Sequence, residues 1–163
     1  MKRERRILAL ALALTLLLGL SVAALAAEET KELTLQVGTE GTAVSLDGLP
    51  VQPYWEGETL MVPLRKIGEA LGYRVDWDRS TGALTMDDGT VQRVALLDGS
   101  AKAVFTGELK VINMSREVEL TAPVTVHNGY TFVPLALFEE FFNDVSQENG
   151  VISVSPRMSE LQD

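Results

Sequence analysis

A short segment occurs twice in this chain, and it restricts the folds that the chain can adopt. Met61-Val62-Pro63-Leu64 recurs 71 residues later as Phe132-Val133-Pro134-Leu135. Each copy follows a turn that contains glycine and precedes apolar residues at helical spacing. Proline cannot donate to a central sheet ladder, but it suits the first turn of a helix. Pro63 and Pro134 therefore predict two places where a strand ends and a helix begins.

The residues behind each proline predict two short helices. The first helix is expected to bury the face formed by Leu64, Ile67 and Leu71. The second is expected to bury the corresponding face, formed by Leu135, Phe138 and Phe142. Gly72 predicts a left-handed cap at the end of the first helix, and Asn143 takes this place in the second.

The remaining sequence alternates apolar and polar residues in short runs between turn residues, as strands do. The predicted strands are residues 33–37, 43–46, 49–51, 59–62, 73–77, 83–86, 91–97, 102–105, 109–112, 117–120, 124–126, 131–133 and 151–154. Asp47-Gly48 predicts a hairpin between the second and third of these. An isolated hairpin is marginal, so we expect one α+β domain of antiparallel β-hairpins packed on two short helices. It would consist of two degenerate strand-helix-hairpin repeats.

Residues 1–27 predict a secretory signal peptide. A basic start, with Lys2, Arg3, Arg5 and Arg6, precedes an apolar run and the small residues Ala24-Leu25-Ala26. The run is shorter than the roughly 20 residues that span a bilayer, so we expect cleavage and no membrane anchor afterwards. The sequence contains no cysteine, so disulfides contribute nothing to stability.

The expected mature chain is strongly acidic. Without the four basic residues and one acidic residue of the signal segment, the 14 basic and 23 acidic residues leave a net charge of −12. Such a chain repels nucleic acid, because phosphate contacts require Lys and Arg. The composition favours a secreted or cell-surface protein.

Three segments around the first copy carry a family resemblance. Residues 59–65, 69–72 and 75–78 resemble the copper amine oxidase N-terminal-like domain, also called the stalk domain, of secreted bacterial proteins. The second copy fits over 128–135 but has Ala136 for Arg and Asn143 for Gly, and it lacks the Asp-Trp-Asp segment. The resemblance covers nearly all of the predicted domain, residues 28–156, with 157–163 as a polar tail. It implies a non-catalytic module outside the cytoplasm and does not imply copper.

The polar residues predict little catalytic or metal chemistry. Copper or zinc would need several His or Cys ligands, whereas His127 is the single histidine and is expected to be a solvated turn residue. Calcium is an alternative for the oxygen ligands Asp76, Asp78, Ser80 and Asp87, although Gly is missing from the sixth loop position. Paired carboxylates for glycoside hydrolysis would be Asp76 with Asp78, Asp87 with Asp88, or Glu139 with Glu140. No cofactor is expected.

Aromatic residues suggest where a ligand binds. Tyr54 and Trp55 precede a turn and are the predicted ligand contacts. Trp77 is expected to be buried in alternation with Val75. The motif residues Pro63, Arg65, Glu69, Gly72, Trp77 and Pro134 are assigned structural roles. Arg65 and Glu69 lie four residues apart on the first helix and could pair, or Arg65 could reach a carbonyl or an acid in the neighbouring sheet.

These observations favour a secreted, non-catalytic module of the cell envelope that binds a protein or a wall polymer. A small carboxylate-dependent glycan hydrolase and a calcium-stabilised structural domain are the alternatives.

Overall fold

The computed structural model describes residues 33–90, 92–107 and 114–157. The predicted signal peptide (1–27), the predicted strand 109–112 and the tail beyond residue 157 lie outside the described residues. None of the helices in the described ranges is long and apolar enough to span a bilayer. The described residues belong to the unit that begins at Leu33.

The first sheet joins the two ends of this unit. Its strand order is β12-β13-β1-β2. β1 (Thr34–Val37) runs parallel to β13 (Val151–Pro156) and antiparallel to β2 (Thr42–Val44), while β12 (Asn143–Glu148) forms a hairpin with β13. The strands nearest the two ends of the unit therefore pair directly.

The second sheet contains both copies of the repeated segment. Its order is β10-β11-β4-β3. β3 (Tyr54–Glu56) and β4 (Thr59–Pro63) form one hairpin, and β10 (Thr125–His127) and β11 (Tyr130–Pro134) form the other. β4 and β11 are antiparallel neighbours, with Val62 opposite Val133. The two Val-Pro segments thus lie side by side.

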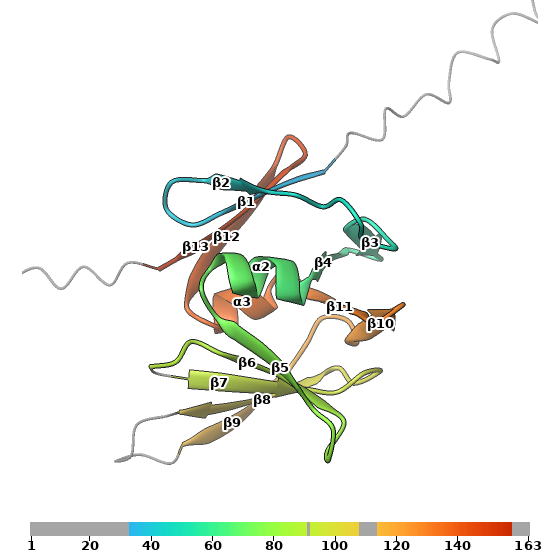
Figure 1. The fold of residues 1–163 in the computed structure, drawn as a ribbon, viewed down its shortest axis with the longest axis vertical. Coiled ribbons are helices and arrows are strands. Elements are labelled where there is room, and N and C mark those ends of the chain that lie inside the picture. Colours follow the sequence, from blue (N-terminus) through green and yellow to red (C-terminus); the bar gives the residue numbers. More distant parts are fainter. Residues whose placement is uncertain (1–32, 91, 108–113, 158–163) are drawn as a thin grey trace, which may run out of the picture. The chain divides into compact units, whose positions relative to one another are not determined.

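The third sheet is an antiparallel meander of five strands. β5 (Arg74–Asp78), β6 (Ala83–Asp87), β7 (Gln92–Leu96), β8 (Lys102–Gly107) and β9 (Ser115–Glu119) pair in sequence order. Figure 1 shows both helices lying between this sheet and the sheet of β1, β2, β12 and β13. α2 (Leu64–Ala70) contacts β2, β5 and β11, and α3 (Leu137–Glu140) contacts β12.

Side chains of the two helices lie at the centre of the hydrophobic core. Leu64 and Ile67 of α2 and Phe138 of α3 are fully buried, together with Val62 and Val133 beneath them. α2 begins directly after Pro63, as predicted, whereas two residues separate Pro134 from α3. The α+β class and the antiparallel sheets packed on two short helices are confirmed, with the parallel β1–β13 pair as an addition.

Several local predictions were wrong. Residues 49–51 form no strand, and β2 pairs with β1 instead of returning through Asp47-Gly48. The turn at Gly48, with φ of 76°, is therefore local and does not define a hairpin. β3 and β12 were not predicted. Each pairs with the strand that follows it, β4 and β13 respectively, and this pairing outweighs the weak alternation of the two segments.

The end of α2 follows the predicted pattern, whereas the end of α3 does not. Gly72 has φ of 83° and closes α2 as predicted, with its own N–H bonded to Glu69 O and that of Tyr73 bonded to Gly68 O. In α3 the left-handed residue is Phe142, with φ of 59° and 56% of its surface exposed, so it is not a core residue.

Phe141 fills the core in place of Phe142, and Asn143 is a fully buried residue of β12. The second helix has four residues and the first has seven. In the alignment of the two copies the second helix ends one position earlier, which moves the left-handed residue by one position.

Candidate functional site

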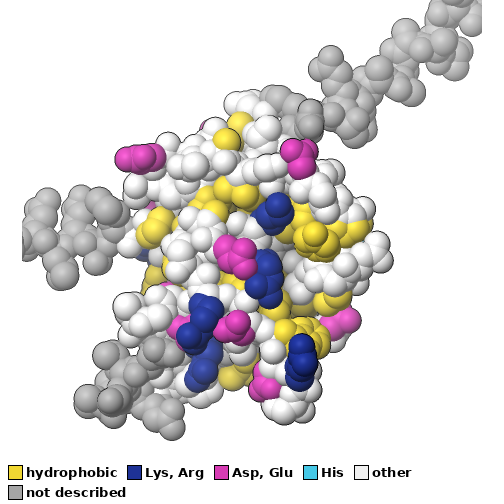
Figure 2. Space-filling model, in the orientation of Figure 1, with side chains coloured by type: hydrophobic (Ala, Val, Ile, Leu, Met, Phe, Trp, Pro, Cys, Tyr) yellow, Lys and Arg dark blue, Asp and Glu magenta, His cyan; other side chains and the backbone are white. Residues whose placement is uncertain are grey.

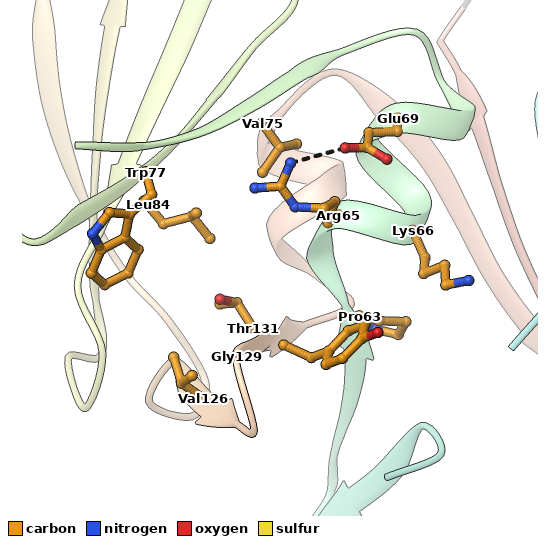
Figure 3. A pocket seen from close by; sticks show the side chains of 11 residues that line it. Pro63, Arg65, Lys66, Glu69, Val75, Trp77, Leu84, Val126, Gly129 and Thr131 are labelled. Atoms are coloured by element: carbon orange, nitrogen blue, oxygen red, sulfur yellow. Dashed lines mark hydrogen bonds and ion pairs between the residues drawn. The ribbon is translucent and has the colours of Figure 1, made fainter. Parts of the chain in front are cut away.

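A cleft of about 610 Å³ opens between α2, the β5–β6 hairpin and the β10–β11 hairpin. We call it the Trp77 cleft. Its apolar part consists of Pro63, Val75, Leu84 and Val126. Figure 3 shows Trp77 and Leu84 on one wall, facing Arg65 on α2 and Thr131 on β11. Its walls come from three segments that are far apart in the sequence.

Two partly exposed aromatic rings border this cleft. Trp77 on β5 is 50% exposed and Tyr130 at the start of β11 is 39% exposed. The prediction that Trp77 is buried with Val75 was wrong. Both residues lie on the same face of β5, but only Val75 reaches the core, where its methyl group meets Gly68 of α2. Trp77 lies two residues further along the strand, at the open end of the cleft.

Backbone geometry fixes the opposite wall. Asn128 and Gly129 have φ values of 48° and 83°, the pair of left-handed residues that a type I′ hairpin requires. This turn joins β10 to β11 and places Tyr130 and Thr131 in the lining. The Asn-Gly sequence therefore predicts the turn, but not that the hairpin forms a cleft with α2.

The helix contributes an ion pair to the cleft. Arg65 Nη1 donates to Glu69 Oε1 at 2.9 Å, and the two side chains are 51% and 55% exposed. The predicted pairing is confirmed, and the alternative in which Arg65 reaches into the sheet is not observed. An exposed pair at this spacing contributes about 0.3–0.5 kcal/mol, so its effect on stability is small. Figure 2, in the orientation of Figure 1, shows Lys and Arg side chains beside exposed hydrophobic ones on the face of the molecule that is turned to the viewer.

The predicted ligand contacts Tyr54 and Trp55 lie elsewhere and do not form one platform. They alternate on β3, opposite Met61 and Leu60 respectively. The Tyr54 hydroxyl lies 2.8 Å from Thr125 Oγ1 and 3.2 Å from His127 Nε2.

His127 is consequently a packed residue of β10, with its ring against Tyr54 and Phe132, and the expectation of a solvated turn histidine was wrong.

Trp55 borders a second hollow. It is 54% exposed, and the hollow, about 790 Å³, is more open than the Trp77 cleft. Its charged lining consists of Glu56, Glu58 and Glu139, over an apolar part formed by Leu60, Leu135 and Val145. Contact between Trp55 and a ligand remains a prediction.

Comparison with known proteins identifies the family. The family described as "Copper amine oxidase N-terminal domain" matches residues 38–155, most of the chain. The chain belongs to this family. A protein named "Protease inhibitor" from Brevibacillus choshinensis is 26% identical over 148 residues, which cover 88% of this chain and 40% of the relative. The chain thus spans about two-fifths of that relative's length. No solved structure matches.

The copper amine oxidase N-terminal domain is a non-catalytic accessory domain. The donor set of this member does not fit copper, since the sequence has one histidine and no cysteine. Among the described residues, no group of three or more His, Cys, Asp or Glu side chains is placed to hold a metal ion.

The predicted calcium ligands are occupied by other contacts. Asp76 pairs with Arg74 Nε at 3.0 Å, and the buried Asp87 pairs with Arg74 Nη2 at 3.1 Å. Asp78 Oδ1 accepts hydrogen bonds from the hydroxyl and the backbone N–H of Ser80, which lower the pKa of the Asp78 carboxyl. The three carboxylates thus stabilise the β5–β6 hairpin separately and do not form a calcium loop.

The candidate carboxylate pairs likewise fail to converge on a cleft. Asp76 and Asp78 have the contacts described above, and Glu140 pairs with Arg116 at 2.7 Å. Glu139 borders the second hollow without its neighbour Glu140. In the Trp77 cleft, Glu69 is the single carboxylate of the lining. A glycosidase needs two carboxyl groups on either side of the scissile bond.

Proposed function

We propose that this chain is an exported, non-catalytic binding module of the cell envelope, which holds a protein or a wall polymer in the Trp77 cleft. The observation that carries the proposal is the cleft itself. It combines two partly exposed aromatic rings, an apolar interior and a charged pair, and its volume lies within the range of small-ligand sites. The non-catalytic nature of the family's domain supports it.

Export through residues 1–27 is part of this proposal. A basic start, a short apolar run and small residues are the features that a signal peptidase substrate requires. The acidic charge of the mature chain suits a protein outside the cell that binds neither nucleic acid nor, after cleavage, the membrane.

We also propose that the two Val-Pro segments are degenerate repeats that serve as the scaffold of the site. Each segment follows a hairpin and leads into a helix and a second hairpin. The first copy supplies Pro63, Arg65 and Glu69 to the cleft, while the second supplies Tyr130 and Thr131. In this view the cleft lies between the two copies, and neither copy forms it alone.

Sedimentation with isolated bacterial cell walls tests the proposal. The two tryptophans provide a matched pair, because Trp77 and Trp55 are similarly exposed and only Trp77 lines the cleft. We expect the wild-type protein and Trp55→Ala to co-sediment with the walls and Trp77→Ala to remain in solution. We also expect no soluble sugars to be released. Equal binding by the two variants would contradict the assigned site, and sugar release would support the hydrolase alternative.

Protease inhibition is a second candidate, favoured by the name of the relative that matches 88% of this chain. An inhibitor, like a wall-binding module, binds its target without catalysing a reaction. Residual activity of one secreted serine protease, one cysteine protease and one metalloprotease, each at a tenfold excess of the protein, tests it. Stoichiometric inhibition of any of the three would favour this candidate, and full activity in all three would remove it.

A further inference from the structure

We infer that the ligand of the Trp77 cleft is a neutral sugar unit of a glycan, which stacks on Trp77 and whose hydroxyl groups bind Arg65 and Glu69. The inference rests on the proposed function, in which this cleft is the binding site. It adds the chemical class of the ligand and the role of each side chain.

The shape of the cleft favours a compact ring over an extended peptide. Its volume of about 610 Å³ suits a ligand of small-molecule size, such as one or two sugar rings. Extended peptides commonly add to a sheet through backbone hydrogen bonds along an edge. Here Val75, Trp77 and Leu84 meet the cleft with side chains on the face of the β5–β6 hairpin. β5 and β10 are edge strands of their sheets, but the lining residues of the β5–β6 hairpin offer the cleft ring and side-chain contacts.

The aromatic residues supply the stacking surface. Trp77 is 50% exposed in the lining of the cleft, and Tyr130, 39% exposed, lies on the β10–β11 hairpin. Exposed apolar surface of this kind marks contact sites. The C–H face of a sugar ring is apolar while its edge carries hydroxyl groups, so a ring placed against Trp77 covers the indole and leaves its hydroxyl groups free to bond.

The ion pair on α2 supplies partners for those hydroxyl groups. A guanidinium only donates hydrogen bonds, an ionised carboxylate only accepts them, and a hydroxyl does both. Arg65 and Glu69 lie together at 2.9 Å on the wall that faces Trp77 in Figure 3. One ring hydroxyl, or two on adjacent carbons, would therefore find both a donor and an acceptor.

The charges match a neutral ligand. Arg65 and Glu69 neutralise each other, whereas an acidic sugar would have to compete with Glu69 for the guanidinium. The mature chain, with its net charge of −12, also repels anions at long range. Lys66 borders the cleft too, but Figure 3 shows its side chain directed away from Trp77.

Tryptophan fluorescence tests the inference directly. The sequence has two tryptophans, so Trp55→Phe leaves Trp77 as the only tryptophan, which is excited at the red edge of its absorption, beyond that of tyrosine. This variant is titrated with chitotetraose and cellotetraose, which are neutral, with tetragalacturonate, which is acidic, and with tetra-alanine. We expect a saturable change of Trp77 emission with at least one neutral oligosaccharide, and a Kd that is unchanged between 50 and 500 mM NaCl because no ionic attraction is involved.

A pair of matched substitutions identifies the polar contact. Glu69→Gln in the Trp55→Phe background is expected to weaken neutral oligosaccharide binding roughly tenfold, since it removes a charged acceptor. Glu58→Gln makes the same chemical change in the second hollow and is expected to leave the Kd unchanged. Thermal melts of both variants show whether the fold is retained.

Tighter binding of tetragalacturonate or tetra-alanine, or no response to either neutral oligosaccharide, would overturn the inference. If cell-wall binding still depended on Trp77 in that case, the proposed function would stand without the sugar assignment.

Discussion

Replacing Asn143 by alanine is expected to destabilise the fold strongly, because this residue joins the ends of the two helices. Its side chain is fully buried. Its Nδ2 donates to the carbonyl oxygens of Phe138 at 3.1 Å and Phe141 at 3.0 Å, and its Oδ1 accepts from the Tyr73 hydroxyl at 2.8 Å. The amide thus binds two carbonyl groups at the end of α3, of which Phe138 O also accepts from Phe141 N–H, and it binds the residue that follows the cap of α2.

The three hydrogen bonds set the magnitude. A net contribution of about 1 kcal/mol for each bond gives a loss of about 3 kcal/mol of unfolding free energy for Asn143→Ala. Tyr73→Phe removes one of the bonds and should cost about 1 kcal/mol. Asn143→Asp keeps an acceptor for Tyr73 but loses both donors, and it places a charge beside two carbonyl oxygens. At neutral pH it should therefore cost at least as much as alanine.

Urea unfolding of the three variants and of the double mutant Tyr73→Phe/Asn143→Ala measures these terms. The loss for the double mutant should be smaller than the sum of the two single losses, because both remove the same hydrogen bond. A cost below 1 kcal/mol for Asn143→Ala, or strict additivity in the cycle, would refute the assigned role of this amide.

Three further predictions concern caps, charge and pH. Phe142 takes a left-handed conformation that Gly72 takes without strain. Phe142→Asn should therefore raise the unfolding free energy by about 0.5–1 kcal/mol, and Gly72→Ala should lower it by about 1 kcal/mol. The midpoints of urea unfolding check the sign of both changes. Glu69→Gln should change the unfolding free energy by no more than about 0.5 kcal/mol, because its ion pair is exposed, and a larger loss would contradict this. Burial raises the pKa of the Tyr73 phenol above its ordinary value of 10.0. The resulting stability is fully present below about pH 10 and falls as pH rises through the raised pKa. The urea midpoint should therefore fall less between about pH 9 and 11 in Tyr73→Phe than in the wild type. An equal fall of the midpoint in both proteins would contradict this.

The sequence predicts those parts of the fold that depend on local chemistry. Proline after a strand marks the start of α2, Gly72 marks its end, and Asn128-Gly129 marks a hairpin turn, because each requires a backbone conformation that few residues adopt. The parallel β1–β13 pair depends on segments more than 100 residues apart, and no local pattern indicates it.

The site is harder to predict for the same reason. Alternation places Trp77 and Val75 on one face of β5 but does not show how far the core extends beneath that face. The core reaches Val75, and the strand continues beyond it. Phe142 is the opposite example, because it was expected in the core and is exposed. The hydrophobic spacing of α3 fits either phenylalanine, and the earlier end of this helix decides that Phe141 is buried.

Binding at the Trp77 cleft is the central element of the proposed function, and fluorine NMR of protein labelled with 5-fluorotryptophan tests it most directly. The two tryptophans give two resonances, which Trp55→Phe and Trp77→Phe assign. We predict that solubilised cell-wall glycan shifts or broadens the Trp77 resonance and leaves the Trp55 resonance unchanged. A response confined to Trp55 would place binding at the second hollow and contradict the proposed function of the Trp77 cleft.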